Sequence, residues 1–510
     1  MPAYQPQFSS PARLTSALAG KVVIPEYGGF DEARRAWNLA IDQRPAAVAF
    51  PEFPQDVAAA VLFAREFGLR VAAQGTGHNA GPLGPLQDTV LIKTERMRGV
   101  SIDPARRIAR VEAGALWLEV VEAAAQHGLA ALAGSSPDVG VVGYTLGGGV
   151  SFLGRNYGLA TNHVSAVELV TADGRLIRAD RENEPDLFWA LRGGGGSFGI
   201  VTAVEFELFP ITEAYAGVLW YPIERGREVL HAWRELTNSE RLPDELTTIG
   251  RFLNLPPIPE IPEPIRGKSF AAIEAYHLGD PAEADALLAP LRALGPVNDT
   301  VAKVPMPALS HMHMDPEQPV PVAGDGLLVD HLTADALDAF VEVAGANARF
   351  PLLTVELRHL GGELRRPRPE HGALGSIDGD YLMFAASMVP KPELEAPVRT
   401  QVQAVKAALA PWAARQMYLN FAETQPDPST FWTEQAYHRL RRIKAAVDPD
   451  DLIRSNHPIP PAVASRRGGA ERAGVSFEKR RFDGATVSAS EPDSDSGETR
   501  TAIAARSARR

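Results

Sequence analysis

Three glycine-rich loops in the first 202 residues constrain this chain more than any other feature of its sequence. They read QGTGHN at Gln74–Asn79, GSSPDVGVVGYTLGGG at Gly134–Gly149 and RGGGGSFGIVT at Arg192–Thr202. Glycine lets backbone N–H groups approach a ligand closely, and consecutive N–H groups form concave sites for anionic oxygens. One such loop alone is more typical of a tight turn. Three in one part of the chain favour a large nucleotide ligand that carries a pyrophosphate.

The third loop also matches the dinucleotide fingerprint G-x-G-x-x-G, at Gly194–Gly199. In a Rossmann domain, a strand precedes these glycines and a helix follows them. Here the pattern predicts the reverse order, with a helix at Asp186–Arg192 and a strand at Ile200–Leu208. The match therefore indicates a nucleotide-binding turn outside a Rossmann fold.

The composition excludes several classes of function. The chain has 63 acidic and 51 basic residues, a formal net charge of -12 and no cysteine. An acidic surface repels nucleic acids and anionic membranes, and without thiols any redox chemistry needs a bound cofactor. The sequence has neither a secretory signal pattern nor an apolar window of about 18 residues. We therefore expect a cytoplasmic enzyme that binds neither nucleic acid nor membrane.

The 510 residues exceed what one hydrophobic core usually contains, and their patterning predicts an α+β protein of several parts. Residues 1–210 alternate short β-branched runs with helical periodicity. Residues 211–414 contain proline-dense stretches between strand-like runs, which predicts an antiparallel sheet. Residues 415–461 predict a short strand, a loop and a helix at Phe431–Val447, whereas 462–510 have too little apolar surface to fold.

Several motifs, taken together, resemble one family of flavoenzymes. Gly75–His78, Ser135–Gly149, Asp186–Thr202 and Arg439–Pro460 occur in the order found in berberine bridge enzyme-like FAD oxidases. These oxidases have the vanillyl-alcohol oxidase, or PCMH-type, fold. The resemblance covers both ends of the chain, whereas the middle matches only in general character.

The resemblance implies a two-part FAD-binding domain, made of residues 1–210 and the C-terminal segment 415–461. Residues 211–414 would form the substrate domain, an antiparallel sheet covered by helices. The implied FAD contacts, read from the motifs, are Gly75, Thr76, Gly77, His78, Asn79, Ser135, Ser136, Asp138, Val139, Gly140, Gly143, Tyr144, Gly147, Gly148, Gly199, Ile200, Val201 and Asn456.

By the same resemblance, His78 carries the flavin covalently on its 8α-methyl carbon. A neutral imidazole is a suitable nucleophile for this bond. Many relatives form a second bond through a cysteine that aligns with Ser136, and serine cannot replace that thioether. We therefore expect a single attachment. Tyr144 replaces a family histidine, and Gln74 and Thr76 also depart from the family pattern.

The catalytic base is where this sequence departs most from the family. In many relatives, the last tyrosine of a Tyr-x-Asn-Tyr motif accepts the substrate's hydroxyl proton. Here the motif ends in Phe421, which cannot accept a proton. Tyr418 in the predicted strand, Tyr144, and Tyr381 or Asp378 remain as candidates. Alternatively the substrate, such as an amine or an activated C–H compound, needs no strong base.

The resulting hypothesis is an FAD-dependent oxidase. It would transfer a hydride from a small alcohol, sugar or secondary metabolite to flavin N5, with O2 as the electron acceptor. Two alternatives remain: a flavin dehydrogenase with another acceptor, and a flavin-binding protein without turnover, which Phe421 favours. His311 and His313 lack a third ligand at a usual spacing, so we expect no metal site.

Overall fold

A computed structural model describes residues 11–240, 242–259, 261 and 263–462. The predicted unstructured tail at 462–510 lies outside these residues, except for Ala462. Helices and antiparallel sheets alternate along the chain, which confirms the predicted α+β class. No helix in the described ranges combines the length and the apolar character that crossing a bilayer requires.

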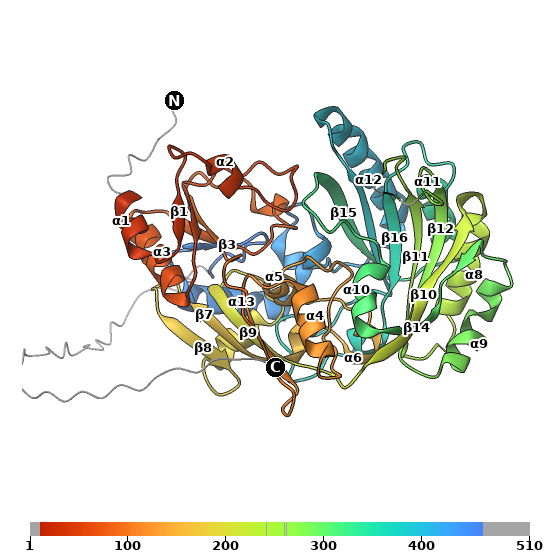
Figure 1. Cartoon of the computed structure of the whole chain (residues 1–510), viewed down its shortest axis with the longest axis horizontal. Helices are drawn as coiled ribbons and strands as arrows, with labels where there is room; N and C mark the ends of the chain where they lie inside the picture. The colour runs from red at the N-terminus through yellow and green to blue at the C-terminus, as the bar shows by residue number, and fades with distance from the viewer. Residues whose placement is uncertain (1–10, 241, 260, 262, 463–510) are drawn as a thin grey trace, which may run out of the picture. The chain divides into compact units, whose positions relative to one another are not determined.

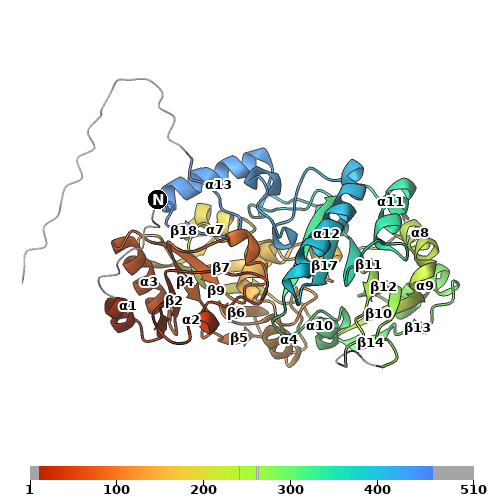
Figure 2. The same ribbon diagram turned by 90° about the horizontal axis from the view of Figure 1, so that it is seen from above.

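The first sheet has the strand order β1-β2-β4-β3-β18. Figure 1 labels its strands β1 and β3, and Figure 2 labels β2, β4 and β18. Its strands are β1 (Lys21–Val23), β2 (Ala47–Phe50), β4 (Thr89–Lys93), β3 (Arg70–Gln74) and β18 (Ile453–Arg454). Only the β1–β2 pairing is antiparallel. Helix α3 (Pro54–Glu66) buries its apolar face against this sheet. The last strand comes from the C-terminal segment, so the two ends of the described chain share one sheet.

The second sheet is antiparallel, in the order β5-β6-β9-β7-β8. Its strands are β5 (Val100–Asp103), β6 (Ile108–Glu112), β9 (Ile200–Glu207), β7 (Val164–Val170) and β8 (Leu176–Asp180). The helices of this region are α4 (Trp117–Ala125), α5 (Val141–Leu146), α6 (Gly154–Tyr157) and α7 (Pro185–Leu191). Two of the glycine-rich loops therefore connect helices and strands of this second layer.

The third sheet is the largest and is entirely antiparallel, in the order β13-β10-β12-β11-β16-β17-β15, with β14 also paired to β10. Its strands are β10 (Glu213–Pro222), β11 (Leu246–Asn254), β12 (Ser269–His277), β13 (Asn298–Asp299), β14 (Ala302–Pro305), β15 (Val322–Val329), β16 (Thr354–His359) and β17 (Tyr381–Met388). Both faces of β11 and β12 are buried, so polar side chains on them need partners inside the protein.

Helices cover the outer face of this third sheet (Figure 2). They are α8 (Gly226–Thr237), α9 (Pro281–Arg292), α11 (Ala334–Ala344) and α12 (Glu395–Leu409). The inner face turns toward the other two sheets, and the short α10 (Leu309–Met312) packs there. This arrangement leaves the inner face free to form one wall of a site.

Two predictions for the C-terminal segment differ from the structure. Helix α13 spans Glu434–Val447 and starts at the N-cap Thr433, whose hydroxyl accepts a hydrogen bond from the Ala436 N–H; the prediction had started it at Phe431. The predicted strand at Tyr418 is wrong, because Leu419–Phe421 form a 3-10 turn. The Asn79 side chain donates hydrogen bonds to the carbonyls of Leu419 and Ala422, so no neighbouring strand pairs with them.

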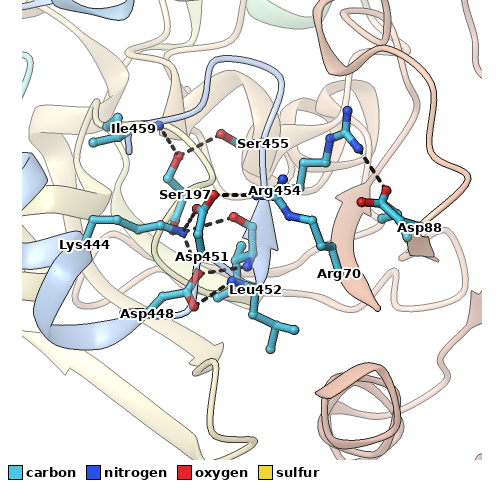
Figure 3. A network of polar contacts seen from close by, with 12 residues as sticks. Arg70, Asp88, Ser197, Lys444, Asp448, Asp451, Leu452, Arg454, Ser455 and Ile459 are labelled. Carbon is cyan, nitrogen blue, oxygen red and sulfur yellow. Dashed lines mark hydrogen bonds and ion pairs between the residues drawn. The ribbon is translucent and has the colours of Figure 1, made fainter. Parts of the chain in front are cut away.

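A buried network fixes the C-terminal segment to the third glycine-rich loop (Figure 3). The Lys444 ammonium group is fully buried and donates to Asp448, to the Ser197 carbonyl at 3.0 Å and to the Ile453 carbonyl at 3.1 Å. Asp448 in turn accepts from the N–H groups of Leu452 and Ile453. This network sets the position of the segment that leads to β18.

We expect Lys444→Met to destabilise the protein by about 3–5 kcal/mol, because it leaves the Asp448 carboxylate buried without its cation. Chemical denaturation followed by circular dichroism measures this loss. Arg442→Met on the exposed side of the same helix is the matched control and should change stability by less than about 0.5 kcal/mol. Equal stabilities of the two variants would contradict this role of the network.

Candidate functional site

A cavity of about 1010 Å³ lies where the three sheets and the C-terminal segment meet. The glycine-rich loops form one wall of it, and the inner face of the third sheet forms the opposite wall. Of the residues predicted to bind the cofactor, its lining includes Gly75, Thr76, Gly77, His78, Asn79, Ser135, Ser136, Val139, Gly140, Gly143, Tyr144, Gly147, Gly199, Val201 and Asn456. Chain folding thus brings together loops that are more than 100 residues apart in the sequence.

The loop wall has the backbone geometry of a cradle. Gly77 has φ +88, and a Cβ atom there would lie 2.9 Å from the Ala36 Cβ. Gly149 has φ +76, and a Cβ atom there would lie 2.5 Å from the Tyr144 ring. Side chains at these two positions would be strained and would displace the neighbouring residues. Only glycine therefore permits this close packing of the loops around the cavity.

Two buried polar atoms of this wall have no hydrogen-bond partner among the described residues. They are Oε1 of Gln74 and Oδ1 of Asn79. Buried polar groups are normally paired, so unpaired acceptors around an open cavity fit a polar ligand. The cradle and these atoms together match a dinucleotide.

His78 is a reactive side chain of the loop wall, and neighbouring side chains hold its ring in place. Its ring stacks on Trp37 with centroids 3.9 Å apart, and its Nδ1 lies 2.7 Å from the Thr76 hydroxyl. Its Nε2 lies 3.4 Å from Oδ1 of Asp138, which also accepts hydrogen bonds from Trp37 Nε1 and the Ser136 hydroxyl. Burial acts to raise the pKa of Asp138, but these partners outweigh it and lower that pKa. Asp138 therefore stays ionised beside the imidazole.

Two family models match the parts of the chain that form the loop wall. The FAD binding domain model matches residues 45–180, and the berberine and berberine-like model matches residues 417–460. (R)-6-hydroxynicotine oxidase of Paenarthrobacter nicotinovorans is 28% identical over 475 residues, which cover 87% of this chain and 97% of that protein. Over most of its length, the chain is therefore similar to berberine bridge enzyme-like FAD-linked oxidoreductases, and it contains an FAD binding domain and a berberine-like segment.

Other relatives show the same similarity. Xylooligosaccharide oxidase of Thermothelomyces thermophilus is 26% identical, over 84% of this chain and 89% of that protein. The crystal structure of 6-hydroxy-D-nicotine oxidase from Arthrobacter nicotinovorans superposes with a TM-score of 0.76 at 26% identity, over 89% of this chain and 100% of that one. Glucooligosaccharide oxidase from Acremonium strictum, which carries 6-S-cysteinyl, 8α-N1-histidyl FAD, has a TM-score of 0.74 at 23% identity, over 89% and 99%.

The cofactor of this oxidoreductase is FAD, and the residues of the loop wall fit it. Three predicted contact residues lie outside the lining. Asp138 acts on His78 instead, Gly148 packs against Leu374 and Tyr418, and Ile200 is buried in the core beneath the first sheet. Packing turns Gly148 and Ile200 away from the cavity.

Two of the predicted candidates for the catalytic base lie away from the cavity. Tyr381 is buried in the core beneath the outer helices, where its hydroxyl bonds Thr237 at 2.7 Å and burial raises its pKa to about 12. Asp378 lies on the surface with 81% of its side chain exposed. Neither lines the cavity, so neither is in a position to accept a proton from a substrate there.

The other two tyrosines lie next to the glycine-rich loop. Tyr144 lines the cavity, but its hydroxyl donates to the Leu132 carbonyl at 3.1 Å. The Tyr418 hydroxyl accepts from the Val150 N–H at 3.0 Å and from the Asn420 amide at 3.1 Å. Burial raises the pKa of both side chains. Both hydroxyls hold the loop in place, and burial disfavours their ionised forms.

The structure contains a buried cluster of charged side chains that the sequence did not predict. We define this charged cluster as Arg251, Glu274, His313, Glu356 and Arg358. These side chains project from β11, β12 and β16 and from the loop after α10, and each is at most 9% exposed. His313 lies between the two glutamates, with Nδ1 2.9 Å from Glu274 and Nε2 2.9 Å from Glu356.

His313 is a cation at neutral pH in this cluster. Burial and the charge of Arg251 act to lower its pKa, but the carboxylates of Glu274, Asp315 and Glu356 outweigh them and raise it to about 9. The only signal in the sequence was a charged residue at a central position of each apolar strand run. Strand pairing, which the sequence did not reveal, brings these residues into one cluster.

Glu423 is a further cavity residue that the sequence analysis did not single out. It follows Phe421 by two residues, and its backbone N–H donates to Asp325. Burial and the nearby Asp325 carboxylate raise the pKa of Glu423 to about 8. Its carboxyl group is therefore mostly protonated at neutral pH, which makes it a proton donor on the cavity wall.

Glu423 should make stability depend on pH. A carboxyl whose folded pKa is raised stabilises the fold fully below its unfolded value of 4.5, and this contribution is lost as pH rises toward about 8. We expect Glu423→Gln to remove this loss, so that its Tm exceeds that of the wild type increasingly from pH 5 to pH 8.5. The gain corresponds to on the order of 2 kcal/mol. Parallel Tm curves in differential scanning fluorimetry would contradict the assignment.

Proposed function

We propose that this protein is an FAD-dependent oxidase whose flavin is bound covalently, through a single bond, to His78. The geometry of His78 carries the proposal, because its ring is held by Trp37 on one side and by Thr76 and Asp138 at its two nitrogens. The histidyl linkage of glucooligosaccharide oxidase supports it.

The environment of His78 suits bond formation at Nδ1. The Asp138 carboxylate near Nε2 favours a proton on that nitrogen and stabilises the positive charge that the ring gains when Nδ1 forms a bond. The Thr76 hydroxyl positions the Nδ1 lone pair. Ser136, at the position of the second attachment in many relatives, donates its hydroxyl to Asp138. Its role is therefore to hold the carboxylate, and one covalent bond remains.

When bound, FAD supplies a hydride acceptor and passes the electrons on to O2. The chain supplies the geometry, with the glycine cradle on one side and the charged wall of the third sheet on the other. We propose that the substrate is a small alcohol, sugar or secondary metabolite that binds between them. Because Phe421 cannot accept a proton and Glu423 is mostly protonated at neutral pH, a base for such a substrate would have to come from the ionised carboxylates of the charged wall.

The covalent bond is tested by acid precipitation of the purified protein. We expect the wild type to keep its yellow colour in the pellet and His78→Ala to release it to the supernatant. Asp138→Asn should still bind flavin but should form the bond at least about tenfold more slowly, because the charge that helps Nδ1 is lost. Arg227→Gln on outer helix α8 serves as a control and should resemble the wild type. Release of flavin from the wild-type pellet would rule out the covalent bond.

The acceptor is tested without knowing the substrate. The protein is reduced with dithionite under anaerobic conditions and then mixed with oxygenated buffer in a stopped-flow instrument. An oxidase should reoxidise within seconds and should form one equivalent of H2O2. Reoxidation over many minutes, with fast reaction toward a quinone, would instead show a dehydrogenase. Flavin that no candidate substrate reduces would favour a binding protein without turnover.

A further inference from the structure

The outer part of the cavity is apolar, although the first part of the chain supplies a polar cradle. The residues that line it from the third sheet and its loops include Leu253, Leu255, Pro256, Ile258, Ile261, Ile265, Met314, Val320, Val322, Leu353, Phe384 and Met388. Among the described residues, the lining from the third sheet and its loops contains no tryptophan and no tyrosine. The same strands and loops also supply a few polar lining residues, among them Gln318, Thr354 and Ser387. A sugar would still bury hydroxyl groups against the apolar side chains, which is unfavourable without hydrogen bonds.

The charged cluster lies deeper along the same wall, and its carboxylates are already paired. The two oxygens of Glu274 face Arg251 at 2.7 Å and His313 at 2.9 Å. The two oxygens of Glu356 face Arg358 at 2.7 Å and His313 at 2.9 Å. Each carboxylate is therefore ion-paired, although Oε1 of Glu274 and Oε2 of Glu356 have no hydrogen-bond partner among the described residues. A cationic substrate would compete with Arg251 and His313 for these oxygens.

Arg358, like Arg251 with its unpartnered Nε, has unused hydrogen-bonding capacity. Its Nε donates to Glu356 and its Nη2 donates to the Ser135 hydroxyl at 3.2 Å. Within the described part of the chain, no group accepts a hydrogen bond from Nη1. The guanidinium carbon lies 5.0 Å from the ring centre of Phe421, and both residues line the cavity.

The electrostatic effect of Arg358 reaches the tyrosines beside the glycine-rich loop. Burial raises the pKa of Tyr144 and Tyr418, and Arg358 is the charge that acts to lower both. Arg358 is therefore a positive charge close to the glycine-rich loop, on the side of the cluster that faces it. The nearby Asp315 shares the Ser135 hydroxyl, and its second oxygen lies 3.8 Å from His313.

We propose that the substrate is an apolar molecule with one anionic oxygen, and that Arg358 binds this oxygen through Nη1 beside Phe421. The apolar body would occupy the part of the cavity lined by Leu255, Ile258 and Ile265. This inference rests on the proposed oxidase function and narrows its substrate class from alcohols, sugars and secondary metabolites to apolar acids. A hydrogen bond from a guanidinium N–H to an anionic oxygen is stronger than one to a neutral oxygen.

The test measures binding and requires no turnover. The oxidised flavoprotein is titrated with 4-butylbenzoate, its methyl ester, 4-butylbenzylamine and cellobiose, and the change in flavin absorbance gives each Kd. We expect the benzoate to bind about 10- to 100-fold more tightly than the ester, and both to bind more tightly than cellobiose. Equal affinity for acid and ester, or tightest binding of the amine or of cellobiose, would overturn the proposal.

Variants then identify the group responsible. Arg358→Gln should bring the Kd of the benzoate to within about twofold of the ester and leave the ester unchanged. Arg227→Gln, the same substitution on the outer helix, should keep the wild-type ratio. If Arg358→Gln fails to fold, Arg358→Lys keeps the charge but loses the fork geometry and should reduce the ratio without abolishing it. A full ratio in either Arg358 variant would contradict the role of this residue.

A third variant tests the apolar region by itself. Ile258 is 38% exposed, so Ile258→Asp should fold normally. It should weaken both the benzoate and the ester by about tenfold. Unchanged affinity for both would contradict the position of the apolar body.

These outcomes are separate from those that test the proposed function. Slow reoxidation by O2 together with a preserved ratio of acid to ester would overturn the oxidase and leave the binding inference standing. Fast reoxidation together with equal affinities would do the opposite.

Discussion

The buried ammonium group of Lys444 is the interaction on which the shape of the site depends. It joins helix α13, the Asp448 turn before β18 and the Ser197 carbonyl of the third glycine-rich loop. Because an unpaired buried charge is very unfavourable, the C-terminal segment has one stable position. That position places Asn456 in the lining of the cavity, and the 3-10 turn that precedes the helix places Asn420 and Phe421 there as well.

The site combines two walls of opposite character. The loop wall is made of backbone groups and small residues, which suit a cofactor that is large, polar and the same throughout the family. The sheet wall is made of side chains on strands, which can vary without disturbing the backbone hydrogen bonds of the sheet. Arg358 on this wall lies over the ring of Phe421, which the 3-10 turn of the C-terminal segment brings to the same part of the cavity.

Much of the fold and about half of the site could be predicted from the sequence. The pattern located strands such as β9 (Ile200–Glu207) to within one residue, and the glycine-rich loops located the cradle. The strand predicted at Tyr418 failed because local propensity competes with the hydrogen bonds that Asn79 donates from far along the chain. Tyr381 was a wrong candidate for the base because its side chain lies on the face that helices cover. The alternation of side chains along a strand does not tell which face of the sheet that is.

The sequence by itself predicted a large nucleotide ligand, because glycine-rich loops encode local backbone geometry, and the family resemblance of its motifs indicated that this ligand is FAD. Only the tertiary structure decided the charged cluster. Arg251, Glu274 and Glu356 lie on three strands whose order, β12-β11-β16, differs from their order in the chain, and His313 enters from a separate loop. Strand pairing depends on contacts between distant segments, and no short motif records which charges such pairing will bury together.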